Sequence, residues 1–333
     1  MAKYKLKKNL GKKGIFMTFI AISIIATFMV ISVPSDIVIK TNLQSVNTRI
    51  SNINNYVEDL ENVYLERSLY SSSIKTINSL IGYMEDMNEF LDSFEDSFEE
   101  VIIYGTINGD KIEDMIGGNT FINWTNKIKI PSEKALNVKT DFFVEEIEVY
   151  QDSPWHINVL ANVSFNVTSE TVSWHKNVIV ITDISIEGFE DPYYSINTQG
   201  KYKKRINRSY INNEQLHSDR NQIRELIKHE SYLHIESNTE KYFSPSFIMR
   251  FTNTSLGSAC CGIESIVDPN ELIEMDQMES YADYLFFNHT FQDKCNKLYN
   301  ITEIQDDFPN IKFSYDHLII YNFTREYQPP KAC

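Results

Sequence analysis

HINVLANVSFNV, residues 156–167, carries polar side chains at all its even-numbered positions except Leu160. Its odd-numbered positions are all apolar: Ile157, Val159, Ala161, Val163, Phe165 and Val167. Successive side chains of a β-strand point to opposite faces, so the stretch is typical of a strand with one face in a core. We expect Val163 and Phe165 to be buried and Asn162 and Asn166 to be exposed, because a slip of one residue would exchange the two faces.

The same period of two continues on both sides of this strand. Phe142–Tyr150 alternates glutamates with Ile147 and Val149, and residues 172–186 alternate again after a short turn. Three alternating runs joined by short turns predict an antiparallel meander across residues 140–188.

Upstream of the meander, residues 36–98 carry the period of a helix. Apolar residues from Leu43 to Tyr64 follow a 3-4 spacing, which is broken where Arg67 and Ser71 take the next two core positions. A shifted apolar pattern then resumes, so the break is either a stutter in one long helix or a turn between two helices. We predict a helical stem whose seam either joins copies of the chain or packs, in its second half, against the chain's own β-domain.

The N-terminal region predicts a membrane anchor. Ile15–Val33 is a run of nineteen residues without a charge, and as a helix it spans roughly 28 Å, close to the thickness of a bilayer core. Six lysines precede it within a basic tail, residues 1–14, and Asp36 is the first charge that follows. The positive-inside rule therefore puts residues 1–14 in the cytoplasm and the remainder outside the cell membrane.

Two kinds of processing compete with an uncleaved anchor. Signal peptidase could cut after Ser32, and a prepilin-type peptidase could cut after Gly14. We expect the segment to stay attached, because it is longer than the apolar region of most signal peptides and Pro34 lies close to the first site.

An outside location agrees with the acceptor sites for N-glycosylation. The Asn-x-Ser/Thr pattern occurs eight times, always after residue 100, at Asn123, Asn162, Asn166, Asn207, Asn253, Asn288, Asn300 and Asn322. We take these asparagines as glycosylation candidates.

The four cysteines, Cys260, Cys261, Cys295 and Cys333, are even in number and fit no zinc-binding spacing. They are disulfide candidates with three connectivities. A bond between Cys260 and Cys261 requires a strained ring, so we expect each of the two to pair with a distant cysteine, and Cys295 to take part.

Residues 120–333 are predicted to form a β-rich outer domain. The polar stretch 197–241 interrupts it, and KYKKRINR at residues 201–208 reads as solvated, with an acidic partner or a polyanionic glycan as the alternative. A short helix is expected near Asp219–His229. Ile311–Phe323 is expected to be a closing strand. With the helices upstream, this gives an α+β fold class.

The composition excludes some functions. The net charge is −15 although the first fourteen residues are basic, so the acidic remainder repels nucleic acid. His229-Glu230 and His234 resemble a zinc-protease box, but a separation of five residues turns the second imidazole away from the first. No motif for a catalytic, cofactor-binding or metal site emerges, so we expect no cofactor and no enzyme activity.

Six short stretches carry a resemblance: Lys12-Lys13-Gly14, Pro154-Trp155, Ile184–Tyr194, Ser244–Phe251, Cys260–Pro269 and Tyr281–Phe287. They are similar to stretches in a group of uncharacterised archaeal single-pass envelope proteins. The resemblance implies an N-terminal anchor, a helical stem and a β-rich outer domain. The basic-Gly-apolar start also resembles type IV pilins, which typically carry an acid at the fifth position after the cleavage point, where this chain has Phe19.

These observations lead to one expected function and two alternatives. We expect a membrane-anchored cell-surface protein, structural or adhesive, that binds an extracellular protein or glycan. The alternatives are a pilin-like filament subunit and an anchored envelope hydrolase.

Overall fold

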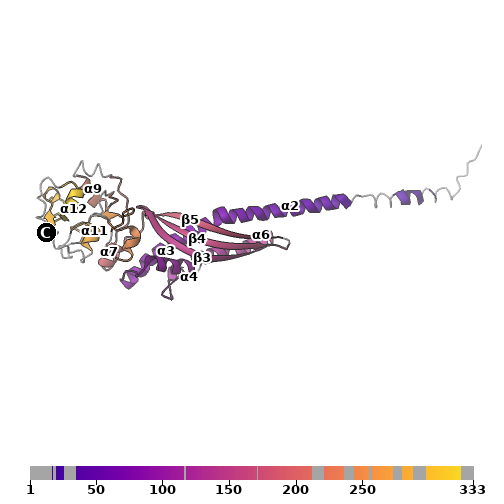
Figure 1. Cartoon of the computed structure of the whole chain (residues 1–333), viewed down its shortest axis with the longest axis horizontal. Coiled ribbons are helices and arrows are strands. Elements are labelled where there is room, and N and C mark those ends of the chain that lie inside the picture. Colours follow the sequence, from indigo (N-terminus) through magenta and orange to yellow (C-terminus); the bar gives the residue numbers. More distant parts are fainter. Residues whose placement is uncertain are drawn as a thin grey trace, which may run out of the picture. The chain divides into compact units, whose positions relative to one another are not determined.

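The structure is a computed structural model (Figure 1), and most of the predicted outer domain is described in it. The described residues are 17, 20–25, 35–115, 118–170, 172–211, 221–235, 244–254, 257–272, 280–287 and 298–323. The basic tail and most of Ile15–Val33 lie outside them, although residues 20–25 are helical. In the part of the chain that is described, no helix is long and apolar enough to cross a membrane.

The chain divides into two compact units, Met1–Val57 and Glu58–Cys333. Helix α2 (Ser35–Asp59) is followed by a π turn, Leu60–Tyr64, and then by α3 (Leu65–Met87). A π turn adds a residue to the helical ladder, which accounts for the phase shift in the apolar pattern. The break in the seam is therefore a stutter within one helix.

The predicted stem, residues 36–98, is not helical throughout. Asn88 ends α3 in a left-handed conformation, with φ of 53°, and its N–H donates to Met84 O. A second helix, α4 (Phe94–Tyr104), begins after Ser93, whose hydroxyl accepts from Asp96 N.

The buried face of α3 combines large apolar residues with small hydroxyl residues. Arg67 and Ser71 are exposed. Serine and threonine fill the buried positions between Leu65, Leu69, Ile77 and Met84: Ser68, Ser72, Ser73, Thr76 and Ser79. Helix α3 packs against the sheet described below and also against the helix α4. The second half of the stem therefore packs against the chain's own β-structure.

The meander is confirmed. Strands β3 (Lys139–Ser153), β4 (His156–Thr168) and β5 (Ser173–Ser185) form an antiparallel sheet in the order β3-β4-β5. The six odd-numbered side chains from Ile157 to Val167 are fully buried. Asn162 and Asn166 are partly exposed on the other face, so the predicted faces are right.

Several short elements follow α4 in the chain and precede β3. They are strands β1 (Thr106–Ile107) and β2 (Asp110–Lys111), a 3-10 turn (Glu113–Met115), and helices α5 (Phe121–Lys127) and α6 (Lys129–Leu136). Helices α3 and α4 lie along the sheet in Figure 1, and α4 and α6 contact β3. One face of the sheet is thereby covered, and its core sits under these helices.

The remainder, residues 186–323, is called the terminal region below. Within the described residues, the long strands of the predicted outer domain, residues 120–333, all lie in the meander, and the terminal region has short helices and short strands. Its described helices are α7 (Pro192–Asn197), α9 (Asn221–Lys228), α10 (Phe247–Arg250), α11 (Asp283–Phe286), a 3-10 turn (Thr302–Ile304) and α12 (Tyr315–Ile320). Its described strands have two or three residues: β6 (Tyr232–Leu233), β7 (Glu264–Ser265), β8 (Leu298–Asn300) and β9 (Lys312–Ser314).

The predicted closing strand, Ile311–Phe323, is a strand only from Lys312 to Ser314 and turns into a helix for a local reason. The Ser314 hydroxyl accepts a hydrogen bond from His317 N and caps α12, so the strand β9 stops at that serine. The apolar residues that follow then bury one side of a helix.

The polar stretch 197–241 is not a solvated excursion throughout. Lys204 and Ile206 are buried. The segment pairs with the loop before α7, since Asp191 N donates to Lys204 O and Ile206 N donates to Phe189 O. The expected helix near Asp219–His229 is present as α9, within the described residues.

Candidate functional site: an acidic groove and a buried charge cluster

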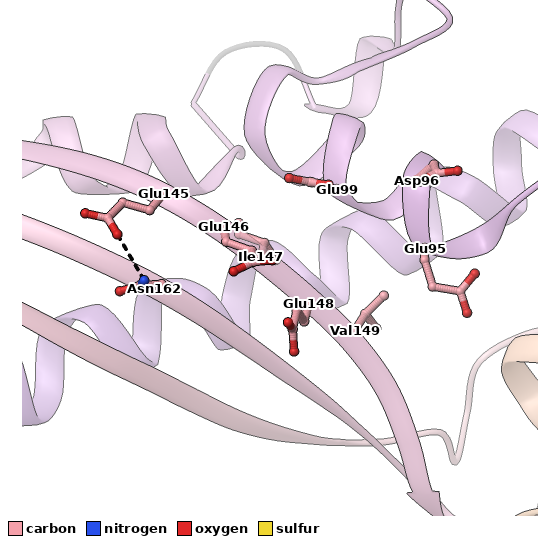
Figure 2. A pocket seen from close by; sticks show the side chains of 9 residues that line it. All are labelled: Glu95, Asp96, Glu99, Glu145, Glu146, Ile147, Glu148, Val149 and Asn162. Atoms are coloured by element: carbon pink, nitrogen blue, oxygen red, sulfur yellow. Dashed lines mark hydrogen bonds between the residues drawn. The ribbon is translucent and has the colours of Figure 1, made fainter.

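A groove of about 580 Å³ lies between α4 and β3 (Figure 2). Six acidic residues line it, three from the first two turns of α4 and three from β3: Glu95, Asp96, Glu99, Glu145, Glu146 and Glu148. Ile147 and Val149 complete its wall on the strand, and Asn162 reaches it from β4. We call this feature the acidic groove.

Local structure explains why so many acids line one groove. Carboxylates near the start of a helix are favoured by the helix dipole, which suits Glu95 and Asp96. On β3 the register with β4 shifts between Val144 and Glu146, so consecutive glutamates sit at a bulge. Glu145 accepts a hydrogen bond of 3.0 Å from Asn162 Nδ2, drawn in Figure 2.

The groove is electrostatically one-sided. In the part of the chain that the structure describes, none of its six carboxylates forms an ion pair with lysine or arginine. Among the same residues no group of three metal-ligating side chains has the geometry to hold a metal ion. The carboxylates can accept hydrogen bonds from a ligand that carries several cationic groups.

A second cluster of charges lies inside the terminal region. Arg250 Nη1 is 2.6 Å from Asp191 Oδ2 and 3.0 Å from Asp283 Oδ2, and all three side chains are fully buried. The guanidinium also donates through Nη2 to Ile263 O. Two carboxylates around one arginine, with additional hydrogen bonds, is the kind of arrangement that lets charges stay buried.

Hydroxyl groups complete the cluster around the two carboxylates. Tyr232 donates to Asp191 Oδ2 at 2.7 Å, and Ser265 donates to Asp283 Oδ2 through its hydroxyl at 2.8 Å and its N–H at 3.1 Å. Burial raises the pKa of the Asp191 carboxyl despite the neighbouring arginine. Burial opposes the charge of Arg250, but the two carboxylates outweigh it and raise its pKa well above the ordinary value.

Lys204 is a buried lysine at the rim of the cluster. Its Nζ lies 3.3 Å from Tyr194 OH and 3.4 Å from Ile266 O, over the rings of Tyr194 and Tyr232. Burial lowers its pKa to about 8, partly offset by the nearby acids. These partners are neutral, so the amine is charged without a directly bonded carboxylate.

A third set of buried polar groups joins α12 to β7. Glu264 accepts from Tyr321 OH at 2.6 Å and lies 3.6 Å from His317 Nε2, while His317 Nδ1 is 2.9 Å from the Ser314 hydroxyl. These side chains are buried. The contacts tie segments together, as in the arginine cluster.

Sequence reasoning missed the buried cluster, although the stretches that carry the resemblance contain it. Asp191, Arg250, Ser265 and Asp283 each come from a different one of those stretches. A usable signal was present: Arg250 stands alone in the apolar run Phe247–Phe251. A single charge inside such a run indicates a buried ion pair.

The prediction of disulfides to distant partners is wrong for the adjacent cysteines. Cys260 and Cys261 are bonded to each other, with Cα atoms 3.7 Å apart, in a turn that brings their sulfurs together. The next residue, Gly262, is pressed against the chain, because a Cβ there would lie 2.1 Å from Ser244 O. Cys295 and Cys333 lie outside the described residues, so the expected bond of Cys295 stays a prediction.

The glycosylation candidates that the structure describes all reach the surface. Asn207, Asn253 and Asn300 are exposed, whereas Asn123, Asn162, Asn166 and Asn322 are partly exposed. Asn288 lies outside the described residues.

Comparison with known proteins adds no relative. No family model matches the chain, and neither does any curated protein or any solved structure.

Proposed function

We propose that this chain is a membrane-anchored cell-surface protein, N-terminus in the cytoplasm, that binds a basic partner in the acidic groove. The uncharged run Ile15–Val33 and the six lysines before it support the anchor. The resemblance to archaeal envelope proteins supports the same arrangement. The observation that carries the binding role is the set of six carboxylates lining one groove without a basic side chain among them.

The expected partner is a peptide segment rich in lysine or arginine. Each exposed ion pair contributes about 0.2–1 kcal/mol, so several must form together to give useful affinity. The groove has a volume of about 580 Å³ and is lined by enough carboxylates to pair with more than one basic side chain. Binding of this kind weakens as salt is added, because the charges are screened.

The groove is tested with the full-length chain and a deca-lysine peptide as the probe. We expect the combined variant Glu95→Gln, Glu99→Gln and Glu148→Gln to weaken peptide binding about tenfold at low salt, as the loss of three pairs implies. A control with the same change in net charge replaces exposed acids elsewhere: Glu113→Gln, Glu133→Gln and Glu187→Gln. Equal weakening by both sets would mean that the peptide binds the acidic surface in general, and would reject the groove.

The anchor is tested separately, by mass spectrometry of the membrane-extracted protein. We expect the mature chain to begin at Met1 or Ala2, with the lysines of residues 1–14 retained. A chain that begins at Ile15 would make filament assembly the leading function. A chain that begins at Val33 would mean a secreted protein and contradict the anchor.

A further inference from the structure

The two edges of the β3-β4-β5 sheet differ in how ready they are to pair with another strand. The β3 edge is interrupted by register shifts after Val144 and Tyr150 and carries the glutamates of the acidic groove. The β5 edge belongs to a strand of thirteen residues whose pairing with β4 is unbroken from Ser173 to Ser185. Bulges and charges are the usual protection of a sheet edge, and only β3 has both.

The β5 strand also exposes apolar side chains on the open face of the sheet. Ile179 is 67% exposed and Ile181 is 51% exposed. Within the described residues no strand or bridge pairs with the outer edge of β5. On that edge no described strand takes up the outward N–H and C=O groups that every second residue of an edge strand carries, so the edge is a template for a further strand.

We propose that two copies of the chain pair through β5, antiparallel and centred on Ile179, so that their sheets become one. Ile179 is the middle residue of β5, and a two-fold axis through it places every residue of the strand opposite a partner. The opposed pairs on the open face are then Ile179 with Ile179, Asn177 with Ile181, His175 with Asp183 and Ser173 with Ser185. On the covered face they are Val178 with Val180, Lys176 with Thr182 and Trp174 with Ile184.

The pairs explain why a second copy fits this edge. An imidazole faces a carboxylate twice, because the two-fold axis repeats the pair of His175 and Asp183. An imidazole can hydrogen-bond to the carboxylate opposite it, and opposed aromatic and β-branched side chains, such as Trp174 and Ile184, stabilise a sheet by about 0.2–1 kcal/mol. Moving the register by two residues instead places Lys176 opposite Ile184 and His175 opposite Ser185, and loses both pairs of imidazole and carboxylate.

The other edge is unsuited to the same symmetry. A two-fold axis at β3 would bring the glutamates of two acidic grooves together, and like charges across an interface are strongly unfavourable. The dimer therefore leaves both acidic grooves open, because the two β3 strands form the outer edges of the joined sheet. This proposal is independent of the binding role of the groove, and it differs from association through the helical stem.

Disulfide trapping in the full-length chain tests the register. Directly opposed residues of antiparallel strands have Cα atoms about 4.5–5.5 Å apart, within reach of a disulfide. We expect Ile179→Cys to give a covalent dimer on mild oxidation, well above the wild-type level. The matched control is Asn177→Cys, on the same strand and face, whose copies would lie about 13 Å apart and stay unlinked. A failure of Ile179→Cys to link, or equal linking of both variants, would overturn the proposal.

Solution mass provides a second test that does not depend on cysteine. In mild detergent we expect the wild-type chain to sediment as a dimer and Ile179→Lys to sediment as a monomer, because two ammonium groups would face each other. The control is Phe143→Lys, which places the same charge on the other edge strand, at a side chain that is 56% exposed, and should stay dimeric. A monomeric wild-type chain, or a dimer that survives Ile179→Lys, would overturn pairing through β5.

Discussion

The meander, residues 139–185, and the terminal region, residues 186–323, bury different kinds of side chain. The core of the meander is apolar, with Ile157, Val159 and Phe165 fully buried on its covered face. The terminal region buries Arg250, Asp191, Asp283, Lys204, Glu264 and His317 among its aromatic rings. The meander is stabilised by the burial of apolar surface. The terminal region also needs a hydrogen-bonding or charged partner for each of its buried charges.

This difference decides how each region responds to change. Trimming an apolar core costs free energy in proportion to the atoms removed and the cavity left. Removing one member of a buried ion cluster leaves the other charges without compensation. The free energy of unfolding then falls by several kcal/mol at once. We therefore expect graded effects in the meander and abrupt effects in the terminal region.

The largest effect is expected from Arg250→Met. The substitution leaves Asp191 and Asp283 buried side by side without their cation, and breaking such a cluster costs about 3–5 kcal/mol. In hydrogen exchange of the full-length chain, we expect peptides around α7, α10 and α11 to lose protection while β4 keeps it. The matched control is Arg205→Met, because Arg205 is an exposed arginine 3.7 Å from Glu190, and it should change stability by less than about 0.5 kcal/mol. Uniform loss of protection would show that the two regions unfold as one.

A slightly smaller effect is expected from pH acting on Lys204. The folded chain holds its pKa at about 8, below the ordinary 10.5. Between these values the unfolded chain keeps the proton that the folded chain has released, so the free energy of unfolding rises with pH. We expect the wild-type chain to gain roughly 3 kcal/mol relative to Lys204→Met from pH 8 to pH 10.5.

Urea unfolding at a series of pH values measures this difference. Lys201→Met replaces an exposed lysine in the same segment and should follow the wild-type profile. A flat difference between wild type and Lys204→Met across the window would contradict a depressed pKa at that lysine.

The smallest effect is expected from trimming single isoleucines in the meander, where a buried position can be compared with an exposed one. Ile157→Val removes one methylene from a fully buried position and should lower stability by about 0.5–1.5 kcal/mol. Ile179→Val makes the same change at a side chain that is 67% exposed, where less than about 0.5 kcal/mol is expected. Equal losses, measured by urea unfolding at low protein concentration, would mean that the open face of the sheet is covered.

The meander and the helices before it were predictable because their patterns are local. Period-two alternation from residue 142 to residue 186 gave the strands, their order and the buried face of β4. The helical period located α3, but not its buried serines and threonine. Hydroxyl residues read as polar in a pattern, whereas Ser72 satisfies its own hydroxyl by donating to Ser68 O in the preceding turn.

Apart from α9, the terminal region was not predictable from such patterns. Its described α-helices have four to eight residues, for example α10 with four and α7 with six, too few to show a period. Its organisation depends on contacts between distant segments, such as Arg250 with Asp191. The bond between Cys260 and Cys261 was missed for a related reason, since the turn that allows it is fixed by the surrounding chain.

The buried cluster also sets an order of events in folding. Arg250 meets one carboxylate 59 residues before it and the other 33 residues after it. The meander joins strands that follow each other directly in the chain, and such local pairings form early. During synthesis, the terminal region therefore has to stay open until residues beyond Asp283 have been added. A ribosome that stalls before that point would leave a finished sheet attached to a region that cannot yet close.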